Sequence, residues 1–510
     1  MNKFFTFLLA AILVLSLAGC GKKPADESSS MSTGDNKDSI TIGISSEPPV
    51  LDPQSTTAHA ARQVYCNIYS NLLEKDEAGK YVGSVAERYE VSDDGLVYTF
   101  HIRDDVKFHN GDPLTANDVR FTLQRGMDSA FVAFFYDAFE TVEAPDDSTV
   151  VVTLKYPASM FLEILTMPQT GIVSEKAVME AGDQYGRDPV GSGPYQFSDW
   201  TSGDHITLTA NENYYGGVPS IKTCTFRIIT DVGTGTIALE KGEIDMYYDI
   251  SSTDKQRILD NAGLVYEEIG SISYEHLVIN CENSKFTDKN VRKALAYAID
   301  LESIIIAGKN GAGVLAENQI PETMFGYSDQ VKAYPYDTEK AKAALAEAGY
   351  ENGFDCVMKV NAGFREKEAQ VIQANLREIG INMDIEVLEW GTFLDDVEAG
   401  NYELALISSN LHIDDPSLVL NSSFNSEKFG TGGNLYRYAN SDLDEMIVQS
   451  FTESDSAARK QLFGDILMLL HEEVPNVPIC WNINNVAYNN QLKGMKVLPL
   501  SHYKIDNLSW

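Results

Sequence analysis

Apolar and polar residues alternate over short stretches in the first half of the chain, and this pattern predicts β-strands. Ile40-Thr41-Ile42-Gly43-Ile44 is a β-branched run that ends before Glu47-Pro48-Pro49, and such runs favour strands. Similar runs between polar turns predict further strands at Tyr89–Ser92, Val97–Ile102, Thr149–Leu154, Thr223–Ile229 and Ile244–Tyr248. Val119 and Leu123 lie one helical turn apart, so we expect a helix over Thr115–Gly126.

The second half of the chain alternates between the helical and the strand pattern. Val291, Leu295 and Ile299 share one face of a long helix predicted over Asp288–Ala307. Other helices are predicted at Asp337–Ala348, Glu368–Ile379, Ser441–Phe451 and Ala457–His471. Strands are predicted at Cys356–Val360, Ile381–Val387 and Tyr402–Ile407. Mixed strands followed by alternating strands and helices favour two α/β lobes over one large sheet.

The N-terminus has the pattern of an export signal. Lys3 precedes the apolar run Phe4–Ala18, which is too short to span a bilayer as a helix but suits a signal peptide. The run ends in Leu17-Ala18-Gly19-Cys20, which resembles the lipobox of bacterial lipoproteins, where the chain is cut before the Cys and the thiol is acylated. We therefore expect a signal peptide over 1–19, lipidation of Cys20, and a polar tether over 20–39. The alternative is an ordinary signal peptide cleaved near Ala18.

Length and charge exclude several classes of protein. The chain has 510 residues with 44% hydrophobic residues, which is enough for large cores and excludes a mainly disordered chain. Asp and Glu total 75 against 39 Lys and Arg, so the formal net charge is −36. A surface this acidic repels phosphate backbones and anionic lipids, and nucleic-acid binding is not expected. Five Cys follow the lipobox without CxxC or zinc-like spacing, so their pairing stays open.

No motif in the chain forms a catalytic constellation. Gly233-Thr234-Gly235-Thr236-Ile237-Ala238 has the form of a dinucleotide fingerprint, but Asp245 follows too closely for the ribose-binding acid. A tight turn between strand and helix explains the glycines equally well. Gly191-Ser192-Gly193 lacks the spacing of a nucleophile elbow, and the 8 His occur singly. We expect a binding protein without a cofactor or a resident metal, not an enzyme.

Several segments in order resemble the extracellular solute-binding proteins of family 5, the peptide and nickel receptors of ABC importers. They are TIGISSEPPVLDPQ, AERYEVSDDGLVYTFHIRDDVKFHNGDPLTANDV, DPVGSGPYQFSDW, LEKGEIDMYYDI, VRKALAYAIDLESII, YDTEKAKAALAEAGYENGF and GNLYRYANSDLDEMI. The resemblance covers the chain from Ile40 to Trp510. It implies an α/β, two-lobed, periplasmic-binding-protein-like fold of the large peptide-binding type.

The resemblance also implies how the lobes divide the chain. Lobe I would hold residues 40–272, with an extra subdomain at about 61–187, and lobe II would hold 273–478. Residues 479–510 would return to lobe I. A two-strand hinge would join the lobes, and two short β-like runs, Leu277–Asn280 and Val477–Trp481, are candidates for its crossings.

The resemblance places the ligand site on a few short segments. Peptide binding in the family uses main-chain pairing with an extended ligand. The positions that match this site, or that could take part in it, are Thr57, Ala58, His59, Arg365, Ser408, Ser409, Asn410, His412 and Asp414. Arg365 lies where some members bind the ligand carboxylate, although a solvated residue at the start of a helix explains it equally well.

The chain departs from the peptide-binding pattern at two of these positions. Peptide-binding members carry an Asp four residues before the Pro of an Asp-Pro pair, and this Asp binds the ligand ammonium. Here the pair is Asp415-Pro416, so His412 stands at that position and Ser409 stands where Trp is usual. A neutral imidazole accepts a hydrogen bond from an ammonium, whereas an imidazolium repels it. Asp414 or Asp415 could substitute, or the ligand could lack a free amine.

The sequence therefore predicts a monomeric, exported receptor, anchored by lipid on the outer face of the cell membrane or in the periplasm. It would capture a peptide-like solute and deliver it to an ABC permease with its ATPases. A receptor for a nickel-type metal chelate or an oligosaccharide is the alternative within the class. An exported hydrolase and a lipoprotein that presents its ligand to a sensor are the alternatives outside it.

Overall fold

The structure of the protein is a computed structural model that describes residues 37–76, 79–411, 413, 415–430, 433–496 and 503–510. The chain divides into two units, residues 1–37 and 38–510. The expected signal peptide, Cys20 and most of the tether lie outside the described residues. No helix in the described part combines the length and the apolar character that crossing a membrane requires.

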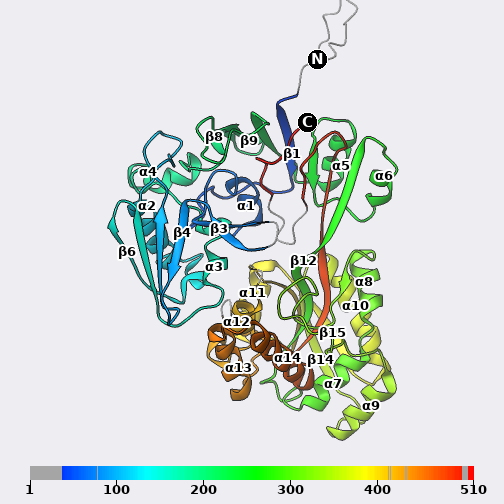
Figure 1. The fold of residues 1–510 in the computed structure, drawn as a ribbon. Coiled ribbons are helices and arrows are strands. Elements are labelled where there is room, and N and C mark those ends of the chain that lie inside the picture. Colours follow the sequence, from blue (N-terminus) through cyan, green and yellow to red (C-terminus); the bar gives the residue numbers. More distant parts are fainter. Residues whose placement is uncertain (1–36, 77–78, 412, 414, 431–432, 497–502) are drawn as a thin grey trace, which may run out of the picture. The chain divides into compact units, whose positions relative to one another are not determined.

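An 11-stranded mixed sheet forms the frame of the second unit (Figure 1). Its strands, in their order across the sheet, are β15 (Asn382–Leu388), β14 (Asp355–Asn361), β16 (Leu404–Asn410), β12 (Leu264–Ile279), β17 (Asn476–Asn489), β11 (Met246–Tyr248), β1 (Ser39–Ile44), β10 (Thr223–Ile228), β9 (His205–Ala210) and β8 (Tyr195–Thr201). The short strand β13 (Val314–Leu315) also pairs with β17.

The two longest strands of this sheet, β12 and β17, lie side by side at its centre. They pair antiparallel from Leu264 with Asn489 to Val278 with Asn476, and the register shifts between Gly270 and Tyr274. The group β14, β15 and β16 joins the sheet through β12, and the group β1, β8, β9, β10 and β11 joins it through β17. Of the two runs predicted as hinge crossings, Leu277–Ile279 lies in β12 and Val477–Trp481 lies in β17, and the two runs meet at the pair of Leu277 with Val477.

Two smaller sheets lie between β1 and β8 in the sequence. One has the order β4 (Ala86–Val91), β5 (Val97–Ile102), β7 (Thr149–Leu154) and β6 (Phe139–Asp146). The other pairs β2 (Leu73–Lys75) with β3 (Tyr81–Gly83). The four-stranded sheet buries Phe100, Phe139, Val150 and Val152 against Val119 and Leu123 of helix α2 (Ala116–Met127). The predicted strands and the predicted helix of this region are confirmed to within a few residues.

Helices form most of the segments that connect the strands in the sequence. They are α1 (His59–Tyr65), α3 (Phe161–Ile164), α4 (Glu175–Ala181), α5 (Val232–Glu240), α6 (Lys255–Leu259), α7 (Lys289–Ala298), α8 (Leu301–Lys309), α9 (Thr338–Glu347), α10 (Phe364–Glu378), α11 (Trp390–Ala399), α12 (Pro416–Phe424), α13 (Ser441–Thr452) and α14 (Ser456–Glu473). Short 3-10 turns are η1 (Ala133–Tyr136), η2 (Pro168–Thr170), η3 (Gly182–Arg187) and η4 (Ser426–Lys428). Asp337 caps α9, because its carboxylate accepts the Lys340 N–H at 3.0 Å.

One predicted helix is wrong in its extent. The segment predicted as one helix over Asp288–Ala307 forms α7 and α8, with a break at Ile299-Asp300. Ile299 is extended, and the Asp300 carboxylate accepts the Ser303 N–H at 3.2 Å, so Asp300 caps a new helix. The apolar periodicity continues across the break because the side chains on both sides of it face the same core.

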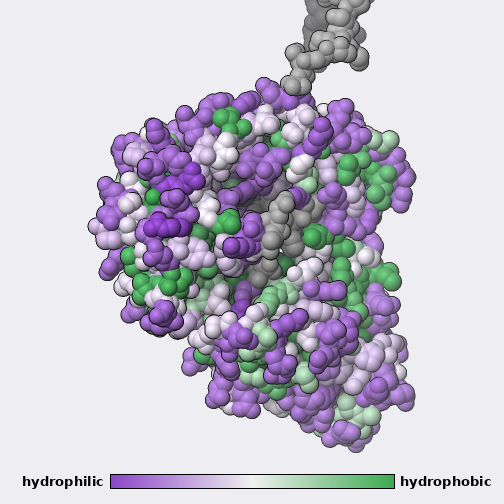
Figure 2. Space-filling model, in the orientation of Figure 1, coloured by the Kyte–Doolittle hydropathy of each residue, from purple (hydrophilic) through white to green (hydrophobic). Residues whose placement is uncertain are grey.

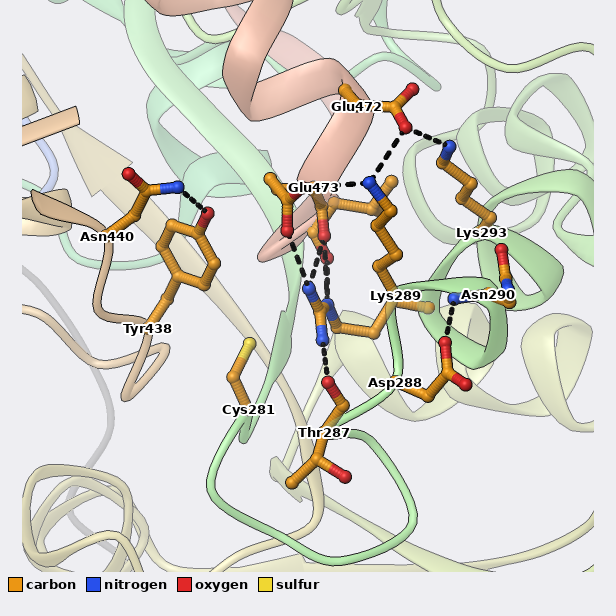
Figure 3. Close-up of polar contacts among 12 residues, drawn as sticks. Cys281, Thr287, Asp288, Lys289, Asn290, Lys293, Tyr438, Asn440, Glu472 and Glu473 are labelled. Carbon is orange, nitrogen blue, oxygen red and sulfur yellow. Dashed lines mark hydrogen bonds and ion pairs between the residues drawn. The ribbon is translucent and has the colours of Figure 1, made fainter. Parts of the chain in front are cut away.

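The end of α14 is held by a cluster of charged residues on α7 (Figure 3). Arg292, only 3% exposed, donates to the Glu473 carbonyl at 2.7 Å and 2.9 Å and to the Val474 carbonyl at 3.2 Å. A helix leaves its last carbonyls without partners in the helix, so the guanidinium supplies the missing donors. At the rim of the cluster, Lys289 and Lys293 point toward Glu472 (Figure 3), with Nζ–Oε1 distances of 3.0 Å and 2.8 Å.

The five described cysteines, Cys66, Cys224, Cys281, Cys356 and Cys480, are free. Burial raises the pKa of Cys66, Cys356 and Cys480 to about 12 and that of Cys281 to about 11. Thiolates are therefore scarce at neutral pH.

Replacing Arg292 should cost much of the stability of the fold. Arg292→Met leaves the Glu473 and Val474 carbonyls without these donors, and breaking such a buried charged contact costs about 3 kcal/mol or more in the free energy of unfolding. Lys293→Met is the matched control, because it removes only the rim contact with Glu472, worth about 1 kcal/mol or less. Urea unfolding followed by circular dichroism measures both changes. Equal losses would show that Arg292 is not the main support of this helix end.

The pH dependence of stability should depend on His276, which is fully buried on β12 beside Tyr436. Burial lowers the pKa of His276 to about 4, so the imidazole stays neutral in the folded protein while it takes up a proton near pH 6.5 when the chain unfolds. This contribution to stability is complete above pH 6.5 and is lost as the pH falls toward 4. Between pH 7 and pH 5, His276 alone should therefore lower the free energy of unfolding by about 2 kcal/mol. His276→Phe should reduce the drop by that amount in urea titrations, and an unchanged drop would contradict the assignment.

Candidate functional site

The parallel strands β14, β15 and β16 end at a common edge of the sheet, and polar groups collect there. Met358 pairs with Ile385 on one side and with Leu404 on the other, so all three strands run in the same direction. Helix α10 begins just after β14, and helix α11 just after β15. Open α/β sheets bind ligands outside the carboxyl ends of their strands. This edge is therefore the candidate ligand site.

The predicted residues Ser408, Ser409 and Asn410 form the last part of β16 at this edge. They pair with Glu275, Tyr274 and Ser273 of β12, respectively. Ser408 and Ser409 are half-buried and Asn410 is exposed. The Ser408 hydroxyl donates to Glu275 Oε2 at 2.7 Å and accepts from Arg365 Nη2 at 2.7 Å. Ser409 and Asn410 thus reach water at the end of a strand, where an extended ligand could lie beside them.

Arg365, in the first turn of α10, is buried and makes an ion pair inside the protein. Its Nε donates to Glu275 Oε1 at 2.6 Å and its Nη2 to Glu275 Oε2 at 3.1 Å. Nη1 donates to Asn361 Oδ1 at 2.7 Å. Arg365 is 7% exposed, so the interpretation of a solvated residue at a helix start is wrong. Its guanidinium meets a carboxylate of the protein itself in the planar geometry that carboxylates prefer.

A second layer of charges lies behind this ion pair. Lys309 Nζ is 3.9 Å from Glu275 Oε2 and also 3.9 Å from Glu368 Oε1. Glu368 is fully buried, and neither of its carboxyl oxygens has a hydrogen-bond partner among the described residues. Burial, and then the negative charge of Glu275, raise the pKa of Glu368 far above its ordinary value. Both effects favour the protonated form of Glu368.

The predicted segment Thr57-Ala58-His59 lies at the start of α1, where Thr57 and Ala58 are half-buried and His59 is exposed. The Ala58 N–H donates to Thr56 Oγ1 at 3.0 Å, and His59 Nδ1 lies 3.2 Å from Arg62 Nη2. Loss of hydration among the surrounding protein atoms, and then the Arg62 charge, lower the pKa of His59 to about 4. His59 is nevertheless an exposed residue, and the lowered pKa favours its neutral form.

The described contacts bring together only some of the predicted residues. They join Arg365 directly to Ser408, and no contact described here joins this pair to Thr57, Ala58 or His59. His412 and Asp414 lie outside the described residues. Asp415, the other candidate for the ligand amine, is 7% exposed and is bound by Arg459, with Nη1–Oδ2 at 2.8 Å. It also caps α12 by accepting the Ser417 N–H at 2.9 Å, so its carboxylate is occupied within the protein.

Trp390 is a candidate site residue that the sequence analysis missed. It begins α11 at the same edge and is 47% exposed, with its ring centroid 5.8 Å from that of Phe393. Glu389 caps this helix by accepting the Gly391 N–H at 2.8 Å, which places Trp390 in the first turn. A large aromatic residue directly after an alternating strand was the available signal, because the end of such a strand lies at the ligand edge. A half-exposed indole offers a face for apolar or aromatic ligand groups.

The glycine-rich motif Gly233–Ala238 lies within α5 and has a structural explanation. Asp231 Oδ1 accepts the Thr234 N–H at 2.7 Å and caps the helix. A Cβ on Gly235 would lie 2.1 Å from Cζ of Tyr247, so glycine is needed for close packing of the helix on β11. In the part of the chain that the structure describes, no group of three or more His, Cys, Asp or Glu residues could hold a metal ion.

Comparisons with known proteins identify the family. The sequence profile described as "Bacterial extracellular solute-binding proteins, family 5 Middle" matches residues 80–431. The heme-binding protein A of Haemophilus influenzae is 29% identical, with 89% of this chain and 88% of that protein covered. The dipeptide-binding protein of Escherichia coli is also 29% identical, with 91% and 92% covered.

Solved structures support the same assignment. The periplasmic binding protein DppA of Helicobacter pylori, solved with the peptide STSA, has a TM-score of 0.80 to this chain at 26% identity. The match covers 92% of this chain and 98% of that structure. The mixed α/β architecture with β12 and β17 at its centre is thus the two-lobed fold of periplasmic peptide-binding proteins. The chain belongs to the bacterial extracellular solute-binding proteins of family 5.

Proposed function

We propose that this protein captures a peptide-like solute between two lobes and delivers it to the permease of an ABC importer. Family membership supports the role of a receptor. The single observation that carries the ligand class is the accessible end of β16, where Ser409 and Asn410 lie at the carboxyl edge of the sheet. The end of a strand suits an extended peptide, which can add main-chain hydrogen bonds that do not depend on its side chains.

The proposed lobes follow the two central strands. Lobe I comprises residues 40–272 and the return 479–510, and lobe II comprises 273–478. The first boundary falls within β12 and the second within β17. The four-stranded sheet β4–β7 belongs to the extra subdomain at about 61–187. Because the two strands pair across both boundaries, closure of the lobes would bend this pair, as in a hinge.

The proposed ligand contacts are Thr57, Ala58 and His59 from lobe I, and Ser408, Ser409, Asn410, His412 and Asp414 from lobe II. A neutral imidazole at His412 would accept a hydrogen bond from a ligand amine. Trp390 adds an aromatic face for a ligand side chain. Catalysis plays no part in this proposal, and the protein works as a monomer. It needs no cofactor.

Other ligand classes remain open to the same test. The names of the relatives include heme and dipeptides, so ligand chemistry varies among proteins of similar sequence. A metal chelate or an oligosaccharide would use the same edge of the sheet. An exported hydrolase would instead show turnover.

A thermal-shift assay on residues 38–510 tests the proposed ligand class. A ligand at about 100 times its dissociation constant adds about 2.7 kcal/mol to the stability of the folded state. We expect pools of short peptides to raise the melting temperature by a few degrees, because the stabilisation is distributed over a large unfolding entropy. Metal chelates and oligosaccharides serve as the comparison. A rise with one of them, and none with peptides, would refute the peptide proposal.

We further propose that lipid on Cys20 holds the protein on the outer face of the membrane. Exported localisation follows from the family, and the Leu17-Ala18-Gly19-Cys20 sequence supports the anchor. Cells fed a radioactive fatty acid should label the wild-type protein and not Cys20→Ser. The variant should also move from the membrane fraction to the soluble one. The matched control is Cys66→Ser, since Cys66 is buried and should not accept lipid. Labelling of the Cys20 variant would contradict this proposal.

A further inference from the structure

We propose that Glu275 is a positioning residue that neutralises Arg365, so that the ligand site receives a neutral ligand group beside this arginine and not a free carboxylate. The inference rests on the proposed peptide-binding function and specifies its ligand further. The inference depends on the contacts that the buried Glu275 carboxylate makes with Arg365 and Ser408, at the carboxyl ends of β14 and β16.

The geometry gives the carboxylate of Glu275 the position that a ligand carboxylate would need. Glu275 is fully buried and Arg365 is 7% exposed. Both carboxylate oxygens accept from the guanidinium, at 2.6 Å and 3.1 Å, and the Ser408 hydroxyl donates to Oε2 at 2.7 Å. This two-point contact uses the charge and the planar donor face of the arginine. A ligand carboxylate arriving here would also be repelled by Glu275.

The surrounding charges make Glu275 the essential anion of the cluster. Lys309, on α8, places its Nζ 3.9 Å from Glu275 Oε2. Cys480 is the neighbour of Glu275 on the adjacent strand β17, and its thiol is buried and protonated. Glu368, from α10, is fully buried, and its charge interacts with Arg365, but none of the described hydrogen bonds joins the two side chains. Glu275 is the carboxylate that makes direct contact with Arg365, and it also lies near Lys309. Removing it would leave an uncompensated arginine at the edge of the ligand site.

The ligand group beside Arg365 should accordingly be an amide, a hydroxyl or a ring. A peptide could meet this requirement with its internal backbone, with a modified C-terminus, or with its carboxylate bound elsewhere. The strand β12 fixes Glu275 beside Arg365. Glu275 lies between Ser408 of β16 and Cys480 of β17, so its backbone cannot move away without breaking the strand pairing at the centre of the sheet.

The experiment compares one peptide as its free acid and as its C-terminal amide by isothermal titration calorimetry. The measured quantity is the ratio of the two dissociation constants. In Glu275→Gln the guanidinium can pair with a ligand carboxylate, so we expect the ratio to shift by about tenfold in favour of the acid relative to wild type. A purely structural role of Glu275 would weaken both ligands equally and leave the ratio unchanged.

Two further variants control the result. Glu368→Gln removes a buried carboxyl group from the same cluster but keeps the hydrogen bonds between Arg365 and Glu275, and it should keep the wild-type ratio. Glu275→Leu combined with Arg365→Met replaces the ion pair by apolar groups, a change that folded proteins often tolerate. It should also keep the wild-type ratio, because Arg365 does not bind the ligand carboxylate. This double variant decides the question if Glu275→Gln alone fails to fold.

Two outcomes would overturn the inference. One is an unchanged ratio in Glu275→Gln, and the other is a roughly tenfold loss of acid preference in the double variant, which would show that Arg365 binds the ligand carboxylate. If wild type binds neither peptide form, the proposed function fails separately. The comparison is then made with N-acetylalanine and its amide on Glu275→Gln, where a preference for the acid supports the inference and no preference refutes it.

Discussion

The pairing of β12 with β17 is the constraint on which the rest of the structure depends. Within the residues that the structure describes, these two strands are the only link in the sheet between two groups of strands. One group is β14, β15 and β16, and the other is β1, β8, β9, β10 and β11. The centre of β12 must therefore be apolar on both faces, because Leu277 and Ile279 face one core and Val278 faces another. The buried polar residues that interrupt this pattern each need a partner. The pair Glu275–Arg365 is the clearest case, since neither charge would be stable there alone.

Most of the fold could be predicted from local pattern, because strands and helices here follow their own periodicity. Thr149–Leu154 alternates cleanly and forms β7 with those bounds. The failure at Asp288–Ala307 has a physical cause. Both α7 and α8 pack on one core, so apolar spacing continues while the backbone breaks at Ile299, where Asp300 can cap a new helix. Apolar periodicity predicts which side chains are buried. It does not predict a short break in the helical backbone, which depends on a capping residue such as Asp300.

The candidate site was less predictable, because its chemistry depends on contacts between distant residues. The resemblance to the family placed the segment Ser408–Asn410 at the site, after the strand predicted over Tyr402–Ile407. The same resemblance named Arg365, but its partner Glu275 lies 90 residues earlier in the sequence. Nothing in either local sequence distinguishes an arginine that binds ligand from one that the protein already neutralises. Trp390 was missed for a simpler reason, since its position after a strand received no weight.

The buried ion pair also bears on how such a site can change its ligand. A receptor that keeps a free guanidinium in its site pays for it with desolvation until a ligand anion arrives, and then gains selectivity for anions. A receptor that supplies the anion itself gives up that selectivity and gains a cluster that is stable without ligand. Ser408 binds Glu275 and Arg365 at once, so the end of β16 is already ordered when the ligand arrives. Pre-ordering lowers the entropic cost of binding, which favours ligands recognised through main-chain contacts over ligands recognised through one charge.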